Sequence, residues 1–183
     1  MTYVLLFRGL NVGGRSAVKM PELAAVLTSL GLRGVRTYIQ SGNAVVECDL
    51  PEAALIALVR DGFTRGFGFA CEVCAVSGEE LARVVAELPF TAEEIEATQQ
   101  AQPEVEHLYV YFLPEPPAPD ALAALQGDGA DGDRIALRGR ALYLLCAGSV
   151  RNSKTAARIG KRLPAATARN WNTVRKLLDM ASK

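Results

Sequence analysis

The chain has 183 residues, of which half are hydrophobic and 22% are charged, and its 20 basic side chains are balanced by 20 acidic ones. This composition is ordinary for a soluble globular protein, and no apolar run approaches the roughly 20 residues that span a bilayer. The N-terminal segment lacks the cationic start and long apolar run of a signal peptide. We therefore expect a cytoplasmic protein with no membrane partner.

The first half of the chain alternates between strand-like and helix-like segments. Leu23, Val26, Leu27 and Leu30 recur with the period of an amphipathic helix. The expected elements, in chain order, are a strand at Tyr3–Phe7, a helix from Pro21 to Gly31, strands at Val35–Ile39 and Ala44–Cys48, a helix from Pro51 that Gly66 and Gly68 end, a strand at Cys71–Val76, and a helix that Ser77 caps. This β-α-β-β-α-β order predicts a ferredoxin-like (split βαβ) half.

The second half repeats this plan without residue-level identity. Its expected elements are a strand at His107–Leu113, a short helix at Asp120–Gln126, a hairpin of Asp133–Leu137 and Leu142–Cys146, a helix carrying Ala156, Ile159 and Leu163, a strand at Ala165–Arg169 and a closing helix at Asn170–Ala181. We predict an α+β fold of tandem ferredoxin-like halves with mostly antiparallel sheets and helices packed on them. The expected divisions are a first half at residues 1–89, an acidic connector at residues 90–104 and a second half at residues 105–183.

Charge is distributed unevenly along the chain. Residues 1–40 hold five Lys/Arg and one acid, residues 41–133 hold three and eighteen, and residues 134–183 hold twelve and one, giving net charges of +4, −15 and +11. The two basic ends of the chain also carry segments rich in amide side chains, and these segments have the sequences least typical of a packed core. If folding brings these segments together, they form a cationic pocket between the two halves that suits an anion.

The segment after the first strand resembles a phosphate-binding P-loop. Gly9–Ser16 matches the spacing G-x-x-x-x-G-K-S, with Arg15 in place of the lysine. The missing lysine, the late helix start near Pro21 and the antiparallel sheet argue against a true P-loop. A looser anion-binding loop, built from glycine N–H groups with Arg8, Arg15 and Lys19, stays open beside a plain exposed crossover.

Three further segments add candidate ligands, and each has a structural alternative. Gln40–Asn43 also reads as a hairpin turn, Arg151–Lys154 as the start of a helix with a solvated cationic face, and Arg169–Thr173 as a helix cap. The candidate ligand-binding residues are Arg8, Asn11, Gly13, Gly14, Lys19, Gln40, Ser41, Asn43, Asn152, Ser153, Lys154, Arg169, Asn170 and Asn172.

Catalytic and metal-binding groups are scarce. The single histidine, His107, lies in an apolar strand and is expected to be packed. Cys71 and Cys74 form a C-x-x-C pair, but on a strand they point to opposite faces and no second ligand pair exists. We expect no metal and no cofactor, and we assign no catalytic residue.

Four segments are similar to the signature of a bacterial family, domain-of-unknown-function family sixteen ninety-seven. They are Leu6–Gly14, Met20–Leu23, Thr37–Asn43 and Thr167–Val174. The resemblance implies a two-part α+β fold and no established activity, substrate or catalytic residue. One departure is Arg15, where relatives commonly have a lysine.

Three hypotheses about function remain open. The first is binding of a phosphorylated or nucleotide-like small molecule, with or without chemistry. The second is an RNA- or DNA-binding module, against which the acidic middle of the chain argues. The third is a structural or regulatory module in which basic and acidic regions pair, within the fold or across an oligomer.

Overall fold

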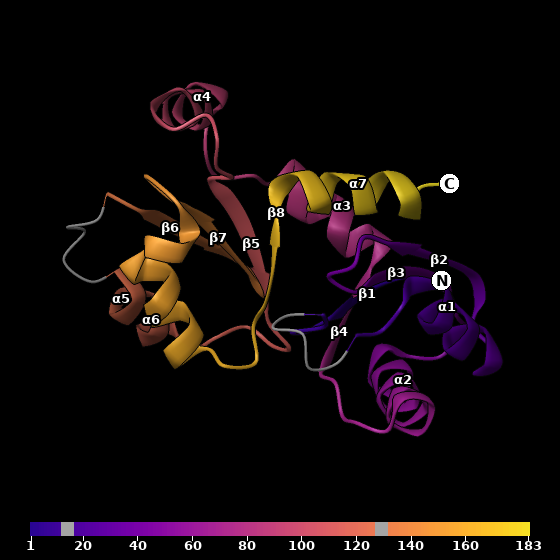
Figure 1. Ribbon diagram of the computed structural model, residues 1–183. Coiled ribbons are helices and arrows are strands. Elements are labelled where there is room, and N and C mark those ends of the chain that lie inside the picture. Colours follow the sequence, from indigo (N-terminus) through magenta and orange to yellow (C-terminus); the bar gives the residue numbers. More distant parts are fainter. Residues whose placement is uncertain (12–16, 127–131) are drawn as a thin grey trace. The chain divides into compact units, whose positions relative to one another are not determined.

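The computed structural model describes residues 1–11, 17–126 and 132–183, and the chain forms two compact units (Figure 1). The first unit comprises Met1–Ala82 with Lys176–Lys183, and the second comprises Arg83–Arg175. The boundaries fall inside α3 (Gly78–Ala86) and α7 (Trp171–Ala181). Residues 90–104, including α4 (Ala92–Ala101), lie in the second unit, and the end of α7 lies in the first.

The first unit contains one four-stranded sheet in the order β2-β3-β1-β4, with every neighbouring pair antiparallel. Its elements are β1 (Thr2–Phe7), α1 (Met20–Ser29), β2 (Arg33–Tyr38), β3 (Asn43–Glu47), α2 (Glu52–Phe67) and β4 (Val73–Ser77). Both crossovers carry a helix, and the two central strands come from the start and middle of the unit. This is the split βαβ arrangement that the sequence pattern predicts.

The second unit repeats that topology, with its sheet in the order β6-β7-β5-β8 and all pairs antiparallel. Its elements are β5 (Leu108–Phe112), α5 (Pro119–Gln126), β6 (Arg134–Arg138), β7 (Ala141–Leu145), a short 3-10 turn η1 (Val150–Asn152), α6 (Lys154–Arg162) and β8 (Thr167–Asn170). Each strand takes the place of its counterpart in the first unit, so the prediction of tandem ferredoxin-like halves is confirmed.

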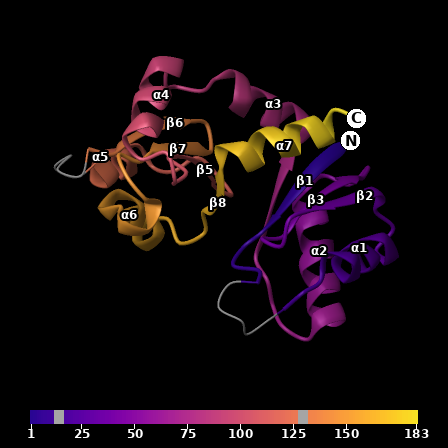
Figure 2. The same cartoon turned by 45° about the horizontal axis from the view of Figure 1, so that its top comes forward.

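Alternation along the strands builds the core of the first unit. Figures 1 and 2 show α1 and α2 on one face of this sheet. Tyr3, Leu5 and Phe7 of β1 belong to the core cluster on that face, with residues of both helices. Val4 and Leu6 point to the opposite face and are also fully buried. Because β1 is apolar on both faces, it occupies the centre of the sheet. The loop that follows β1 therefore starts at the middle of one edge of the sheet.

Two glycines let α1 and α2 approach closely. A Cβ at Gly62 would lie 2.5 Å from the Leu30 side chain, and one at Gly66 would lie 2.8 Å from Val26 Cγ2. The expectation that Gly66 ends the helix is therefore wrong, because α2 continues to Phe67. Gly68 is the terminating residue, since its φ of 77° is the left-handed conformation of a helix C-cap.

The second unit buries both faces of its sheet as well. Tyr111, Leu142 and Leu144 pack with Leu125 of α5 and Ile159 of α6 on one face. On the other face Tyr143 is fully buried, and its hydroxyl donates a 2.8 Å hydrogen bond to the Val84 carbonyl. Burial raises the pKa of Tyr143 to about 12.

Across the described ranges, the chain has no helix with the length and apolar character required to cross a membrane.

Candidate functional site

The loop that leaves β1 is tied down at its base by one asparagine. Asn11 Nδ2 donates to the Val18 carbonyl at 2.9 Å and to the Gln40 carbonyl at 2.7 Å, and Asn11 Oδ1 accepts from the Val18 N–H at 2.7 Å. Asn11 has a φ of 58°, a conformation that asparagine tolerates better than most residues. The side chain therefore joins both ends of the β1–α1 loop to the β2–β3 hairpin.

The hairpin between β2 and β3 packs directly against that loop. Gly42 has a φ of 81°, and a Cβ there would lie 2.7 Å from Leu10 Cδ2 and 2.9 Å from Phe7 Cβ. Asn43 is fully buried and donates to the Tyr38 carbonyl at 3.0 Å and to Ser41 Oγ at 3.1 Å. Gly42 and Asn43 thus build the turn, which is the structural alternative that the sequence favours for these two positions.

The first unit therefore brings together six of the predicted residues. We call this group the loop–hairpin cluster; it consists of Arg8, Asn11, Lys19, Gln40, Ser41 and Asn43. Arg8, Lys19 and Gln40 are exposed, whereas Asn11 and Asn43 use their amides on main-chain groups. Gly13, Gly14 and Arg15 lie outside the described residues.

Two acidic side chains near the cluster are paired with cations. Lys19 Nζ lies 3.8 Å from Glu22 Oε1, and Arg60 Nη2 lies 2.8 Å from Glu72 Oε1. The main chain of Glu72 also accepts a 2.8 Å hydrogen bond from the Arg8 N–H. The helix begins at Met20 and the sheet is antiparallel, so the two structural objections to a P-loop hold.

In the second unit, one predicted residue at the start of α6 is hydrogen-bonded to a carboxylate. Ser153 is the N-cap of α6, and its hydroxyl accepts from the Ala156 N–H at 2.8 Å and donates to Asp133 Oδ2. Asp133 Oδ1 accepts from the Ala147 N–H at 2.8 Å. Asn152 and Lys154, the chain neighbours of Ser153, are exposed. An acidic group of the protein thus stands near the positive end of the helix.

The Arg169–Thr173 segment uses its amides within the fold. Asn170 Oδ1 accepts from the Thr173 N–H at 2.8 Å, which caps α7, and Asn172 Nδ2 donates to Glu106 Oε1 at 2.9 Å. Arg169 Nη1 donates to the Ala168 carbonyl at 2.8 Å. Asn170 pairs with Tyr109 in the β5–β8 ladder.

These segments of the second unit gather at one end of its sheet. Tyr109 lies near the start of β5, and Arg151 opposes the rise in its pKa that burial, Cys146 and Glu106 cause. Tyr111 is the next tyrosine on that face. Its pKa is raised to about 12, chiefly by burial and in smaller part by Cys146, Tyr109 and Asp133. Of the four predicted segments, two meet in the first unit and two lie at this end of the second.

Comparison with known proteins identifies the family. Residues 1–143 match the family model of DUF1697, described as a protein of unknown function. The chain belongs to the DUF1697 family. The match covers the first unit's loop–hairpin cluster and part of the second unit, while the Thr167–Val174 motif lies beyond it.

A solved structure shares this fold. The conserved bacterial protein SP0830 from Streptococcus pneumoniae is 26% identical to this DUF1697 chain, with a TM-score of 0.73 over 98% of each chain. No curated protein sequence matches the chain.

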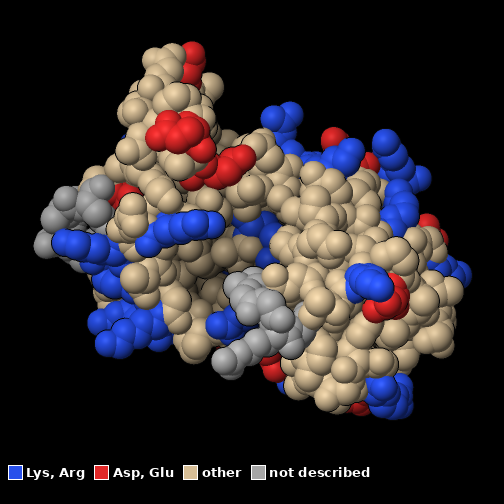
Figure 3. Space-filling view, in the orientation of Figure 1, with Lys and Arg blue, Asp and Glu red and all other residues tan. Residues whose placement is uncertain are grey.

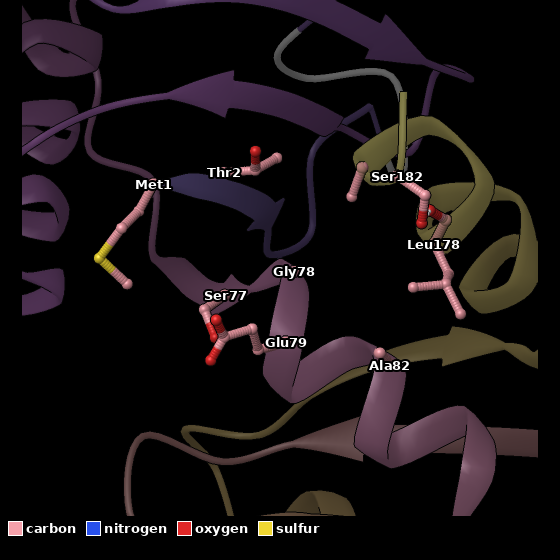
Figure 4. A pocket seen from close by; sticks show the side chains of 9 residues that line it. Met1, Thr2, Ser77, Gly78, Glu79, Ala82, Leu178 and Ser182 are labelled. Carbon is pink, nitrogen blue, oxygen red and sulfur yellow. Dashed lines mark hydrogen bonds between the residues drawn. The ribbon is translucent and has the colours of Figure 1, made fainter.

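A hollow of about 350 Å³ lies in the first unit, away from the predicted residues (Figure 4). Leu178 of α7 and Ser182, which follows that helix, face Gly78 and Ala82 of α3 across it. Its lining mixes apolar and hydroxyl groups with the single carboxylate of Glu79. This composition marks no particular chemistry.

Metal-binding and redox groups are not assembled in the part of the chain that the structure describes. No three His, Cys, Asp or Glu side chains there could hold a metal ion. Cys48, Cys71, Cys74 and Cys146 are buried and form no disulfide. His107 is packed as expected, with Nδ1 2.9 Å from the Cys146 carbonyl and Nε2 2.9 Å from the Gln102 carbonyl.

Two residues that shape these sites carry no clear signal in the sequence. The sequence marks Asp133 only as the start of a strand, and no spacing rule links it to Ser153, twenty positions away. Ile39 is 47% exposed with a φ of 48°, a conformation that a β-branched residue rarely adopts. The residues before Ile39 have the pattern of a strand, so the sequence predicts that Ile39 belongs to that strand and gives no sign of the turn.

Proposed function

We propose that this DUF1697 protein binds a small phosphate-bearing molecule at the loop–hairpin cluster of the first unit. The observation that carries the proposal is the set of hydrogen bonds that Asn11 makes with Val18 and Gln40, which ties the residue before Lys19 to the hairpin. The bond from the Phe7 N–H to the Gly42 carbonyl brings the exposed Arg8 to the same hairpin. Arginine and lysine side chains supply charge-assisted hydrogen bonds to phosphate oxygens. The Gln40 amide and the Ser41 hydroxyl add neutral donors.

Charge favours the first unit over the second for this ligand. The acids beside the cluster are each paired with a cation, Glu72 with Arg60 and Glu22 with Lys19 of the cluster itself. This pairing weakens their repulsion of an anion bound near the exposed Arg8. At the start of α6, Asp133 already places a negative charge where a phosphate would lie. We therefore assign the phosphate to the first unit, and Asn152, Ser153 and Lys154 to a different role.

A thermal-shift experiment on the full chain tests the proposal. Inorganic phosphate, AMP and ATP serve as probes. A ligand at about 100 times its Kd adds about 2.7 kcal/mol to the stability of the unit that binds it, enough to raise Tm by several degrees. We expect a rise with at least one probe, its loss in Arg8→Ala and partial retention in Arg8→Lys, because lysine keeps the charge without the bidentate fork.

The matched control is Arg33→Ala. Arg33 is an exposed arginine at the opposite end of β2 from the hairpin, and its ion pair with Asp49 is between two exposed side chains. This variant should respond to phosphate as the unaltered protein does. An equal loss of response in both arginine variants, or no response to any probe, would refute the proposal.

A nucleic acid is the second candidate ligand, because α6 carries an exposed cationic face. Lys154, Lys161 and Arg162 are exposed on this helix, and Figure 3 shows basic side chains gathered over it. Contacts to several phosphates would make binding fall steeply with salt. A Kd for single-stranded RNA that weakens in Lys161→Ala but not in Arg8→Ala would favour this candidate over the small phosphate.

Arg134 and Glu94 give a direct example of pairing between basic and acidic regions in the second unit. Arg134 Nη1 lies 2.7 Å from Glu94 Oε1, and this hydrogen bond, with that of the Thr91 main chain, lowers the pKa of Glu94. Both side chains are at least about a third exposed, so the pair contributes little to stability. It joins the acidic helix α4 to the basic strand β6.

A further inference from the structure

A second hollow, of about 260 Å³, lies at the end of the second unit's sheet. It is lined by Gln102, Asp133, Gly148, Ser149, Asn152 and Ser153. These residues come from the end of α4, the segment before β6 and the loop between β7 and α6. Pockets for drug-sized ligands run from about 300 to 1,000 Å³. This hollow is slightly smaller, so it suits a smaller molecule, about the size of a monosaccharide.

The carboxylate in this hollow is fixed by neutral donors. Asp133 Oδ1 accepts from the Ala147 N–H, and Oδ2 accepts from the Ser153 hydroxyl. Ser153 is 8% exposed and is itself held as the cap of α6. Each carboxylate oxygen has a second lone pair, so Asp133 can accept further hydrogen bonds from a ligand without moving.

The other polar groups of the lining both donate and accept. Gln102 and Asn152 carry amide side chains and Ser149 carries a hydroxyl. The Gln102 side chain lies against Gly148, where a Cβ would be 3.1 Å from Gln102 Oε1. The main-chain carbonyl of Gln102 lies 2.9 Å from His107 Nε2. The hollow therefore presents one fixed acceptor, the Asp133 carboxylate. Beside it lie amide and hydroxyl groups, each of which can bond both to a donor and to an acceptor of the ligand.

This combination selects among ligand classes. A phosphate would meet the Asp133 carboxylate at close range and be repelled. An ammonium group would satisfy Asp133 but offers no acceptor to the N–H groups of Gln102 and Asn152. A neutral ligand with neighbouring hydroxyl groups satisfies all three side chains, since each hydroxyl donates and accepts.

We propose that this hollow binds a neutral polyhydroxylated molecule of monosaccharide size, with Asp133 as the fixed acceptor and Gln102 and Asn152 as the adaptable partners. This site lies within the second unit and does not depend on the phosphate site proposed for the first.

Nuclear magnetic resonance titration of the full chain tests this proposal, with D-ribose and D-glucose as probes. We expect at least one sugar to shift the side-chain amide signals of Gln102 and Asn152 and the backbone amide signal of Ser149, with saturation in the millimolar range. Gln102→Ala and Asn152→Ala should each weaken binding roughly fivefold, the effect of one lost hydrogen bond. Gln100→Ala, at an exposed position of α4, is the matched control and should bind normally.

Gly148→Leu gives an independent test that leaves Asp133 and its anchors in place. The new side chain would enter the hollow, where the nearest atom is the far end of the Gln102 side chain. We expect this variant to fold and to lose the sugar-induced shifts. Shifts that persist in Gly148→Leu, an absence of shifts with both sugars, or shifts at these residues only with inorganic phosphate or putrescine would overturn the proposal.

Discussion

Asn11 donates a 2.7 Å hydrogen bond to the main-chain oxygen of Gln40, a residue 29 positions further along the chain. The same amide closes the β1–α1 loop by its two hydrogen bonds with Val18. The Asn11 side chain therefore ties the end of this loop at Val18, next to Lys19, to the hairpin. The Phe7 N–H donates to the Gly42 carbonyl at 2.9 Å and ties the end of β1, next to Arg8, to the same hairpin. The geometry of the candidate phosphate site depends on both links.

Replacement of Asn11 should cost both stability and the phosphate response. Asn11→Gly removes the four side-chain hydrogen bonds but keeps the left-handed φ accessible, and we expect a loss of about 1–3 kcal/mol in the free energy of unfolding. Asn11→Ala adds backbone strain of about 1–2 kcal/mol, so it should be the less stable of the two. Chemical denaturation gives both values; an Asn11→Gly protein as stable as the original would contradict the assigned role.

Gly42 should be irreplaceable for steric as well as conformational reasons. Gly42→Ala brings a methyl group to 2.7 Å from Leu10 Cδ2 in addition to forcing alanine to a φ of 81°. Gly31→Ala is the matched control, because Gly31 has a φ of 83° and nothing within 4 Å of the position that an alanine Cβ would take. We expect Gly31→Ala to cost about 1 kcal/mol and Gly42→Ala about 1–3 kcal/mol more. Equal losses in Tm for the two variants would show that the clash is relieved.

Two helical glycines should respond to alanine with opposite signs. Gly160 in α6 has nothing within 4 Å of an added Cβ, so Gly160→Ala should stabilise the protein by up to about 1 kcal/mol through helix propensity. Gly62→Ala would place its methyl group 2.5 Å from Leu30, and the overpacking should cost about 1–3 kcal/mol. Urea denaturation measures both, and the double variant Gly62→Ala/Leu30→Ala should show a coupling that restores part of the loss.

The fold could be predicted from the sequence because its signals are local. Apolar residues in Tyr3–Phe7 mark a central strand, and the order of segments identifies the split βαβ plan. The role of Gly62 could not be predicted, since its close contact is with Leu30, which follows another helix. The same holds for the candidate sites: side-chain chemistry alone marks Gln40 and Asn152 as candidates, but Asp133, which determines what Asn152 faces, is brought there by tertiary structure.

Stability should fall at high pH because of two tyrosines in the second unit. Burial raises the pKa of Tyr111 and of Tyr143 from 10.0 to about 12, so between these values the unfolded chain releases protons that the folded unit retains. The stabilisation from keeping both hydroxyls neutral is complete below a pH of about 10 and is lost as the pH rises toward about 12. Tyr143→Phe should reduce this dependence, at a cost near neutral pH of about 1–3 kcal/mol for the unpaired Val84 carbonyl.

Denaturation at a series of pH values from neutral to alkaline measures both effects of Tyr143→Phe. Tyr38→Phe, at a half-buried tyrosine of the first unit, is the control. It should leave the alkaline loss of stability in place, because Tyr111 and Tyr143, the tyrosines with the largest rises in pKa, are both in the second unit. A Tyr143→Phe protein whose stability declines with pH as steeply as the original would contradict the assigned titration.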